Sequence, residues 1–312
     1  MPLRVAVAAS GGRDSTALLH ATVRAAREGG VEVWALHVHH GLSPNADTWR
    51  DHLQSQCRRW ARAGWPVHFD HTRLSGSPHT GESVEAWARR GRYAALAAMA
   101  REHGIDTVLL AHHRRDQAET VLLQALRGGG PAGAAAMPTA AARAGIHWLR
   151  PWLDHDAQAI EAYVRRHRLR HVEDESNADG RFARNRLRRT VWPALLGAFP
   201  EAEPALASSA RRMAEAARCL QELAEADLQG CFGPGGGLSV LELSRLGRDR
   251  RANLLRHWLQ RVQALPVPES LVQRLAAESC SGRGGRWWPA PEGRVTLRQG
   301  VLHWNELLRC NK

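Results

Sequence analysis

The sequence predicts an α/β fold in which a parallel sheet carries helices on both faces. In the first part of the chain, short apolar runs alternate with longer segments whose apolar residues recur at helical spacing. This order of strand, helix, strand and helix is typical of parallel strands joined by crossover helices. In such sheets ligands bind beyond the carboxyl ends of the strands, so we expect a functional site in the loops that follow them.

The predicted strands of this sheet are four apolar runs, at residues 3–9, 31–38, 66–70 and 107–111. Helical patterns lie between and after these runs, at residues 45–63, 82–103 and 117–126. The first helical segment shows the pattern most clearly, because its apolar residues form one buried stripe: Trp49, Leu53, Cys57 and Trp60.

The later part of the chain is predicted to be mainly helical. Residues 151–199 are helical and strongly charged, and prolines break the pattern at Pro193, Pro200 and Pro204. A long helix at residues 204–228 precedes a glycine-rich loop and two further helical patterns. Short strands then follow around residues 286–288, 294–298 and 301–304. We therefore divide the chain into an α/β domain at residues 1–203, a helical connector and loop at 204–237, and a small α+β domain at 238–312.

The composition favours a folded protein with a polyanionic partner. The 312 residues are 44% hydrophobic, and 43 basic against 31 acidic residues give a formal net charge of +12. Such a charge attracts nucleic acid first and an anionic membrane second. The single lysine is Lys312, so no internal lysine can serve as a base, a nucleophile or a Schiff-base former.

The cysteines and the chain start indicate a cytoplasmic protein without a membrane span. Five cysteines are scattered and contain no C-x-x-C pair: Cys57, Cys219, Cys231, Cys280 and Cys310. This favours reduced thiols and argues against a zinc ribbon or an iron–sulfur cluster. No stretch approaches the roughly 20 apolar residues of a membrane span, and the N-terminus lacks a signal-peptide layout.

The strongest local signal is S-G-G-R-D-S at residues 10–15, between the first strand and a helix that begins near Asp14. Adjacent glycines let main-chain N–H groups approach an anion, Ser10 and Ser15 add hydroxyl donors, and the helix N-terminus adds positive dipole. An ordinary turn with Asp14 or Ser15 as a helix cap fits the glycines equally well. The motif is not a Walker loop, since G-K-S/T is missing. A carboxylate beside phosphate is repulsive without a cation between them, so Asp14 implies Mg²⁺.

The strand and S-G-G-x-D-S together resemble the PP-loop of the ATP-pyrophosphatase family, whose fold is adenine nucleotide alpha hydrolase-like. Its members cleave ATP to AMP and pyrophosphate and adenylate an acceptor oxygen. Further segments resemble the bacterial tRNA(Ile)-lysidine synthetases of that family, in matching order: H-V-H-H-G-L-S at 37–43, and residues 81–93, 111–137 and 173–188. The likeness is looser at residues 246–259, and the chain resembles the short form.

The resemblance implies a ligase that uses ATP to adenylate the C2 oxygen of the wobble cytidine of isoleucine tRNA. The ε-amine of free lysine would then displace AMP and leave lysidine. The loop would bind ATP through six residues: Ser10, Gly11, Gly12, Arg13, Asp14 and Ser15. The resemblance also implies that residues 1–203 form the catalytic domain and that residues 238–312 bind tRNA.

The segment A-H-H-R-R-D-Q-A-E-T, residues 111–120, follows a strand and begins a helix at the same edge of the sheet. Asp116 and Glu119 share a helix face and are our candidates for the ammonium of lysine, and Asp116 joins Asp14 as a candidate Mg²⁺ ligand. His112, four residues before Asp116, could accept the proton as the amine attacks, which makes Asp14, His112 and Asp116 the predicted catalytic residues. A helix cap at Asp116 and an ordinary hydrogen-bonded His112 are the alternatives. The family usually has D-D-Q-x-E-T, but Arg115 replaces the first acid, so this chain has lost one of the two acids of the motif.

The segment 173–188 is the predicted tRNA contact, through Asn177, Asp179, Arg184, Asn185 and Arg188. Arg184 and Arg188 lie one helical turn apart, and two guanidiniums on one face suit RNA phosphates or bases. A solvated charged helix is the alternative. The arginine-rich helix at 248–256 and the pair Trp287–Trp288 are weaker candidates, and packing explains Trp287 and Trp288 at least as well.

Three histidines at the end of the second predicted strand, His37, His39 and His40, could suggest a metal site. We expect them to pack or to contact a nucleotide instead, because no further ligands stand at a recognisable spacing.

Two other functions stay open at this point. Another PP-loop activity such as tRNA thiolation usually needs a reactive cysteine, and none lies near these motifs. A non-catalytic RNA-binding protein on a degenerate PP-loop scaffold is favoured by Arg115 alone. The sequence indicates no obligate protein partner and leaves a homodimer open.

Overall fold

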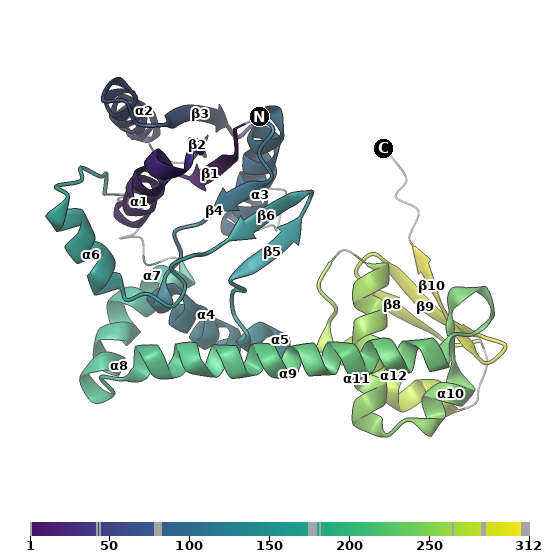
Figure 1. The fold of residues 1–312 in the computed structure, drawn as a ribbon. Coiled ribbons are helices and arrows are strands. Elements are labelled where there is room, and N and C mark those ends of the chain that lie inside the picture. The colour runs from purple at the N-terminus through teal and green to yellow at the C-terminus, as the bar shows by residue number, and fades with distance from the viewer. Residues whose placement is uncertain are drawn as a thin grey trace. The chain divides into compact units, whose positions relative to one another are not determined.

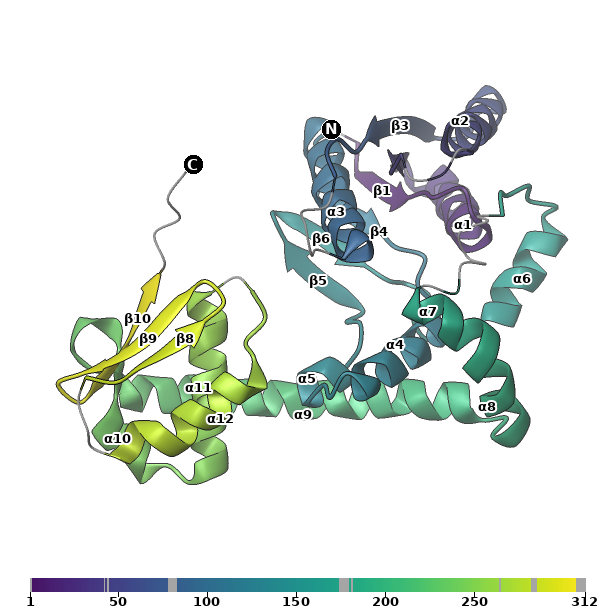
Figure 2. The same ribbon diagram turned by 180° about the vertical axis from the view of Figure 1, so that it is seen from behind.

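The computed structural model describes residues 2–41, 43, 45–77, 83–173, 180, 182–263, 265–281 and 285–306. The chain divides into two compact units, Met1–Ala214 and Glu215–Lys312. Helix α9 (Ala202–Cys231) begins in the first unit and ends in the second (Figures 1 and 2). Each unit has a sheet and a hydrophobic core of its own.

The first unit is built on a six-stranded sheet with the order β3-β2-β1-β4-β6-β5. The strands are β1 (Arg4–Ala8), β2 (Glu32–His39), β3 (Val67–Arg73), β4 (Thr107–Leu109), β5 (Ala140–Arg143) and β6 (Ile146–Leu149). All neighbouring pairs are parallel except β5 and β6, which form an antiparallel hairpin. The predicted parallel sheet and its first four strands are therefore confirmed.

Helices cover both faces of this sheet, as predicted (Figures 1 and 2). The helices of the unit are α1 (Arg13–Gly29), α2 (Ala46–Arg62), α3 (Val84–Glu102), α4 (Arg114–Leu126), α5 (Pro131–Ala134) and α6 (Ala157–Arg166). Alternate side chains of β1 enter different cores, because successive strand residues point to opposite faces. Ala6 packs in the cluster that contains Leu96 of α3, and Val7 packs with Leu19 of α1 and Leu53 of α2.

The charged segment after residue 151 is helical in part, and one expected break is absent. Helix α7 (Ala183–Arg186), a π-helical turn (Leu187–Val191) and α8 (Trp192–Ala198) follow one another directly. The prediction that Pro193 breaks the pattern is wrong, because this proline lies at the start of α8. Proline disrupts the hydrogen bond to the residue four before it, and the π-helical turn shifts the bonding pattern just ahead of Pro193. Pro204 falls in the first turn of α9, where its missing N–H breaks no helical bond.

The second unit is a small α+β arrangement, as predicted. It contains α10 (Val240–Arg245), α11 (Arg248–Val262), α12 (Glu269–Glu278), and short 3-10 turns at Pro234–Gly236 and Ser279–Ser281. An antiparallel sheet of order β7-β10-β9-β8 is formed by β7 (Leu238–Ser239), β8 (Trp287–Ala290), β9 (Gly293–Arg298) and β10 (Val301–Glu306).

The two neighbouring tryptophans of β8 differ in exposure. Trp288 is buried in the core of the second unit and donates to the Glu278 side chain, whereas Trp287 is exposed. In the described part of the chain, no helix has both the length and the apolar character needed to cross a membrane.

Candidate active site at the phosphate loop

The loop at residues 10–15 joins β1 to α1 and requires glycine. Gly11 has φ of +87°, and a Cβ there would lie 3.1 Å from the Val172 side chain. The Gly11 carbonyl also accepts the Val172 N–H at 2.9 Å. Left-handed φ and close packing together restrict this position to glycine.

The loop has main-chain N–H groups and hydroxyls that can donate hydrogen bonds to a ligand. The first helical bond of α1 is donated by Thr16 N to Gly12 O at 3.0 Å, so the N–H groups of residues 13–15 have no partner within the helix. The Ser10 and Ser15 hydroxyls lie 3.0 Å apart, and Gly12 N donates to Ser10 Oγ at 3.3 Å. Gly12 is the N-cap, so neither Asp14 nor Ser15 acts as the cap residue. Hydroxyls and N–H groups at a helix N-terminus form an anion-binding arrangement.

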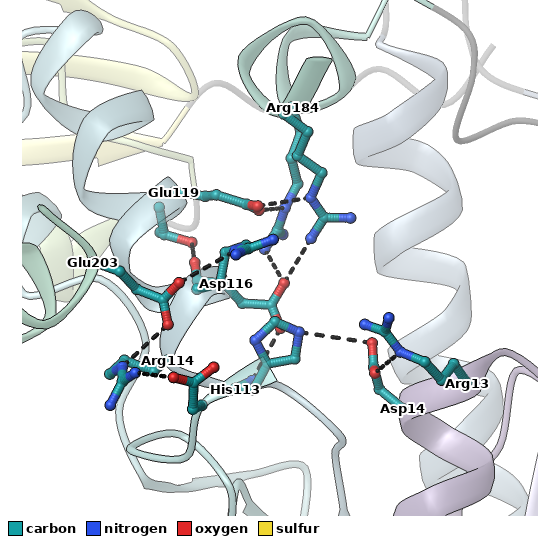
Figure 3. A network of polar contacts seen from close by, with 12 residues as sticks. Arg13, Asp14, His113, Arg114, Asp116, Glu119, Arg184 and Glu203 are labelled. Carbon is teal, nitrogen blue, oxygen red and sulfur yellow. Dashed lines mark hydrogen bonds and ion pairs between the residues drawn. The ribbon is translucent and has the colours of Figure 1, made fainter. Parts of the chain in front are cut away.

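Asp14 lies in the first turn of α1, and its carboxyl group is ionised at neutral pH. Its Oδ1 accepts from Arg13 Nε at 2.9 Å, and its Oδ2 lies 3.6 Å from His113 Nε2 (Figure 3). Burial alone would raise the pKa of Asp14, but the contacts with His113 and Arg13 outweigh burial and lower it to about 2.

His113 lies between two carboxylates at the start of α4. Its Nε2 is 3.6 Å from Asp14 Oδ2 and 3.5 Å from Asp116 Oδ2, and its main-chain N–H donates to Asp116 Oδ2 at 3.0 Å (Figure 3). Burial acts to lower the pKa of His113, but the two carboxylates raise it above its ordinary value. Since β1 and β4 are parallel neighbours, their following loops meet at one edge of the sheet, which brings Asp14 and Asp116 together.

Asp116 and Glu119 are already paired with two arginines (Figure 3). Arg184 donates to Asp116 Oδ1 at 2.7 Å and to Glu119 Oε2 at 2.8 Å. Arg188 donates to Asp116 Oδ1 at 2.8 Å and to Glu119 Oε1 at 2.7 Å. Glu119 is 0% exposed, so this four-residue network stabilises a fully buried charge. The residues predicted to bind lysine and two of those predicted to bind tRNA therefore contact each other.

Arg115, which departs from the usual acidic motif, has an acidic partner in α9. Its Nε donates to Glu203 Oε2 at 3.2 Å, and Arg114 Nε donates to Glu203 Oε1 at 3.1 Å (Figure 3). Glu203 is buried, and the Arg115 guanidinium also lies 5.8 Å from the Trp192 ring centroid. The positive charge at this position is thus paired with a buried carboxylate of α9.

His112 lies close to Asp116 but in a cationic environment. The pKa of His112 is lowered to about 3, chiefly by burial and further by Arg150 and Arg184, against the opposing effect of Asp116. Its buried Nδ1 has no hydrogen-bond partner in the described part of the chain. At neutral pH His112 is therefore an uncharged imidazole.

The remaining predicted tRNA contacts are only partly within the described structure. Asn185 is buried in α7, whereas Asn177 and Asp179 fall outside the described residues.

His37 and His39 lie at the end of β2, and His40 follows them. His37 Nδ1 donates to the Ala9 carbonyl at 2.8 Å, and His39 Nδ1 accepts the Gly41 N–H at 3.1 Å. Among the residues with a described placement, no group of three His, Cys, Asp or Glu side chains could hold a metal ion. His37 and His39 thus each form a hydrogen bond with the main chain.

Comparison with known proteins gives the family. The family model of the PP-loop domain matches residues 2–195. A tRNA(Ile)-lysidine synthase from Bordetella pertussis is 43% identical over 273 residues, which cover 86% of this chain and 83% of that protein. The chain belongs to the tRNA(Ile)-lysidine synthase family. The synthase from Ralstonia nicotianae is 44% identical over 281 residues, which cover 89% of this chain but only 59% of that protein. The chain thus spans less than two thirds of some of the synthases that it matches.

A solved structure shares the fold of this chain. The U34-tRNA thiolase NcsA from Methanococcus maripaludis superposes with a TM-score of 0.58 at 13% sequence identity, over 68% of this chain and 73% of that one.

Two residues of this synthase-family site were not predicted from the sequence. His113 rather than His112 contacts Asp14, and the H-x-x-D spacing of a capping box could have indicated it, because that motif brings the third residue back to the cap. Glu203 carried no such signal, since its contact with Arg115 spans 88 residues and depends on tertiary packing.

Proposed function

We propose that this chain is a ligase that uses ATP to adenylate the wobble cytidine of isoleucine tRNA with a CAU anticodon. Free lysine is then joined to the cytidine, which gives lysidine, AMP and pyrophosphate. The observation that carries the proposal is the meeting of Asp14, behind an anion-binding loop, with His113 and Asp116 beyond adjacent parallel strands. The names of the related synthases support the substrate and the product.

The loop residues suit the pyrophosphate portion of ATP. The N–H groups of residues 13–15 and the hydroxyls of Ser10 and Ser15 would donate to phosphate oxygens. Because Gly11 and Gly12 carry no side chain, the phosphates can approach the main chain. Arg13, next to Asp14, adds a fixed positive charge.

Asp14 is the residue that fits Mg²⁺ best. Magnesium is usually bound through one or two carboxylates together with substrate phosphates, and Asp14 stays ionised at the mouth of the loop. Asp116 fits less well, since its Oδ1 accepts from two guanidiniums and its Oδ2 from a main-chain N–H. A bound Mg²⁺ would offset negative charge as pyrophosphate leaves.

Asp116 and Glu119 remain our proposed ligands for the ammonium of lysine. Both accept hydrogen bonds from Arg184 and Arg188, so lysine binding requires these guanidiniums to give up part of their contacts. When the lysine amine attacks C2, the C–N bond forms, the bond to the AMP oxygen breaks and one proton must leave the nitrogen. His112 is our proposed acceptor of that proton, a role that requires its lowered pKa to rise when the substrates bind.

The RNA contacts of the proposal rest on charge and on the family motif. The net charge of +12 favours RNA, and Arg184 and Arg188 could exchange their carboxylate partners for phosphates. Asn177, Asp179 and Asn185 complete the proposed tRNA-binding set. We also propose that residues 1–203 are catalytic, that 204–237 connect, that 238–312 bind tRNA, and that the protein works in the cytoplasm.

The two alternative functions have less support. Cys57 is the single cysteine in residues 1–214, and burial raises the pKa of its thiol to about 12, so it is a poor nucleophile for thiolation. Arg115 favoured a non-catalytic protein, but its guanidinium is paired with the buried carboxylate of Glu203.

The test is incorporation of labelled lysine into isoleucine tRNA with ATP and Mg²⁺. We expect incorporation with the CAU isoleucine tRNA and none with methionine tRNA. Asp14→Ala should also abolish pyrophosphate release, whereas Asp51→Ala, at an exposed aspartate of α2, should not. Absence of lysine incorporation by the wild-type chain would reject the proposed function.

A further inference from the structure

A cavity lies in the first unit between α1, α2 and the segment that follows α6. Its volume is about 330 Å³, and none of the loop residues 10–15 lines it. Three arginines form part of its wall: Arg59 of α2 and Arg168 and Arg170 of the segment. All three are exposed.

The cavity has three guanidiniums without an acidic partner among the residues whose placement is described: Arg59, Arg168 and Arg170. Arg184 and Arg188, in contrast, are both paired at the active site. Three guanidiniums around one cavity favour an anion, and arginine binds phosphate well through its planar fork.

Gln56 at the base of the cavity carries an unsatisfied acceptor. The side chain is 2% exposed, and its Nε2 donates to the Arg170 carbonyl at 3.1 Å. Its buried Oε1 has no hydrogen-bond partner in the described structure. A buried polar atom without a partner costs free energy, so a ligand that offers an N–H or O–H donor would be stabilised here.

Aromatic rings complete the wall. His20 lies 5.5 Å from Trp60 and 5.0 Å from His167 between ring centroids, and all three residues line the cavity. Burial lowers the pKa of His20 to about 4, so its ring is neutral at pH 7. Aromatic rings beside cationic side chains are typical of sites that bind a nucleobase with its phosphate.

We propose that this cavity binds one nucleotide of an RNA strand. The phosphate contacts the guanidiniums of Arg59, Arg168 and Arg170, a base or ribose donor bonds to Gln56 Oε1, and the base packs beside Trp60. His20 is seven residues beyond Arg13 along α1, roughly 10 Å from the start of that helix, so one bound RNA can reach both the cavity and the phosphate loop. The inference rests on the proposed function only in taking RNA as the source of the nucleotide.

The test compares two neighbouring arginines of α2 in isoleucine tRNA binding. Arg59→Gln removes a cavity guanidinium, while Arg58→Gln removes an exposed guanidinium that does not line the cavity. We expect Arg59→Gln to weaken binding at least about threefold and to reduce the slope of log Kd against log salt by about 0.7 to 1, since one phosphate contact is lost. Arg58→Gln should change the slope much less, and equal slopes for the two variants would overturn the proposal.

A second variant guards against loss of folding. Arg168→Gln removes a second cavity guanidinium at an exposed position, so we expect weaker tRNA binding with a melting temperature close to that of wild type. Wild-type tRNA binding after Arg168→Gln would contradict the assignment of the cavity guanidiniums to phosphate.

Free AMP and CMP carry a base, a ribose and a phosphate, as a nucleotide of RNA does. They therefore test whether the cavity binds a free nucleotide or an RNA strand. If Arg59→Gln reduced the binding of AMP or CMP while leaving tRNA binding unchanged, the RNA assignment would be wrong. If the wild-type chain bound tRNA through the cavity but incorporated no lysine, only the proposed ligase function would fail. No tRNA binding by the wild-type chain would overturn both.

Discussion

The charge of His113 depends on carboxylates from the first turns of two different helices, α1 and α4. Asp14 and Asp116 lie 3.6 and 3.5 Å from its Nε2 and hold its pKa above 6.5 despite burial. Asp14→Asn removes one of these charges, so we expect the pKa of His113 to fall in that variant. NMR titration of the imidazole resonances measures this, and Asp51→Asn on α2 is the control that should leave the pKa unchanged.

The same group makes stability depend on pH. Because the folded pKa of His113 is raised above its unfolded value, the stabilisation from its protonated form is fully present below pH 6.5. It is lost as pH rises through the folded pKa. The difference in free energy of unfolding between wild type and His113→Gln should therefore shrink as pH increases above 6.5. Urea unfolding at several pH values measures it, and a difference that grew with pH would contradict the raised pKa.

Glu119 is the buried centre of the four-residue network. Glu119→Gln leaves Arg184 and Arg188 to share Asp116, and we expect a loss of about 2 to 4 kcal/mol in the free energy of unfolding. Glu161→Gln removes an exposed pair with Arg165 in α6 and should cost at most about 0.5 kcal/mol. Equal losses from the two variants, measured by urea unfolding, would show that the network adds no more than a surface pair.

At the scale of elements, periodicity predicted those strands and helices that bury apolar stripes. Strands β1 to β4 and helices α2 and α3 have such patterns, and their predicted ranges agree with the observed ones to within a few residues. Strand β5 was missed because A-A-A-R has neither alternation nor β-branched residues, and it pairs only with its hairpin neighbour β6.

The strand order predicted which segments form the site, but not which side chains pair within it. Loops after parallel strands meet at one sheet edge, which placed Asp14 and Asp116 together. Which side chains then pair depends on distant contacts: Arg184 and Glu119 are 65 residues apart, and their pairing follows from how α7 packs on α4. Sequence spacing alone could not distinguish an arginine that faces RNA from one that faces a buried carboxylate.

Ion pairs with Glu203 connect helix α4 to the start of α9. Arg115 and Arg114 both donate to its carboxylate, so Glu203→Gln should destabilise the fold by about 2 kcal/mol. In a double-mutant cycle, Arg115→Gln and Glu203→Gln should show a coupling of about 1 kcal/mol, because the residues contact directly. Glu201→Gln, at an exposed glutamate two residues away, is the control and should show no coupling with Arg115→Gln. Additive effects of the Arg115 and Glu203 variants would mean that this ion pair contributes nothing.

At the scale of the whole molecule, positive charge is distributed between internal pairs and free sites. The net charge of +12 includes arginines that neutralise buried carboxylates, such as Arg188 with Glu119 and Arg250 with Asp227. The cavity arginines, such as Arg59, have no such partner in the described structure and are available to a polyanion. Net charge therefore predicts the class of partner, while the pairing pattern predicts where it binds.

The two units have separate hydrophobic cores, and this predicts how the chain unfolds. Leu19 is fully buried in the first unit and Leu255 in the second, and they belong to different clusters. Calorimetry should therefore resolve two transitions. Leu19→Ala should lower one transition and Leu255→Ala the other, each with a loss of about 2 to 5 kcal/mol for its own unit. Helix α9 is shared by both units, so a continuous helix that coupled them strongly would instead give one transition that both variants lower together.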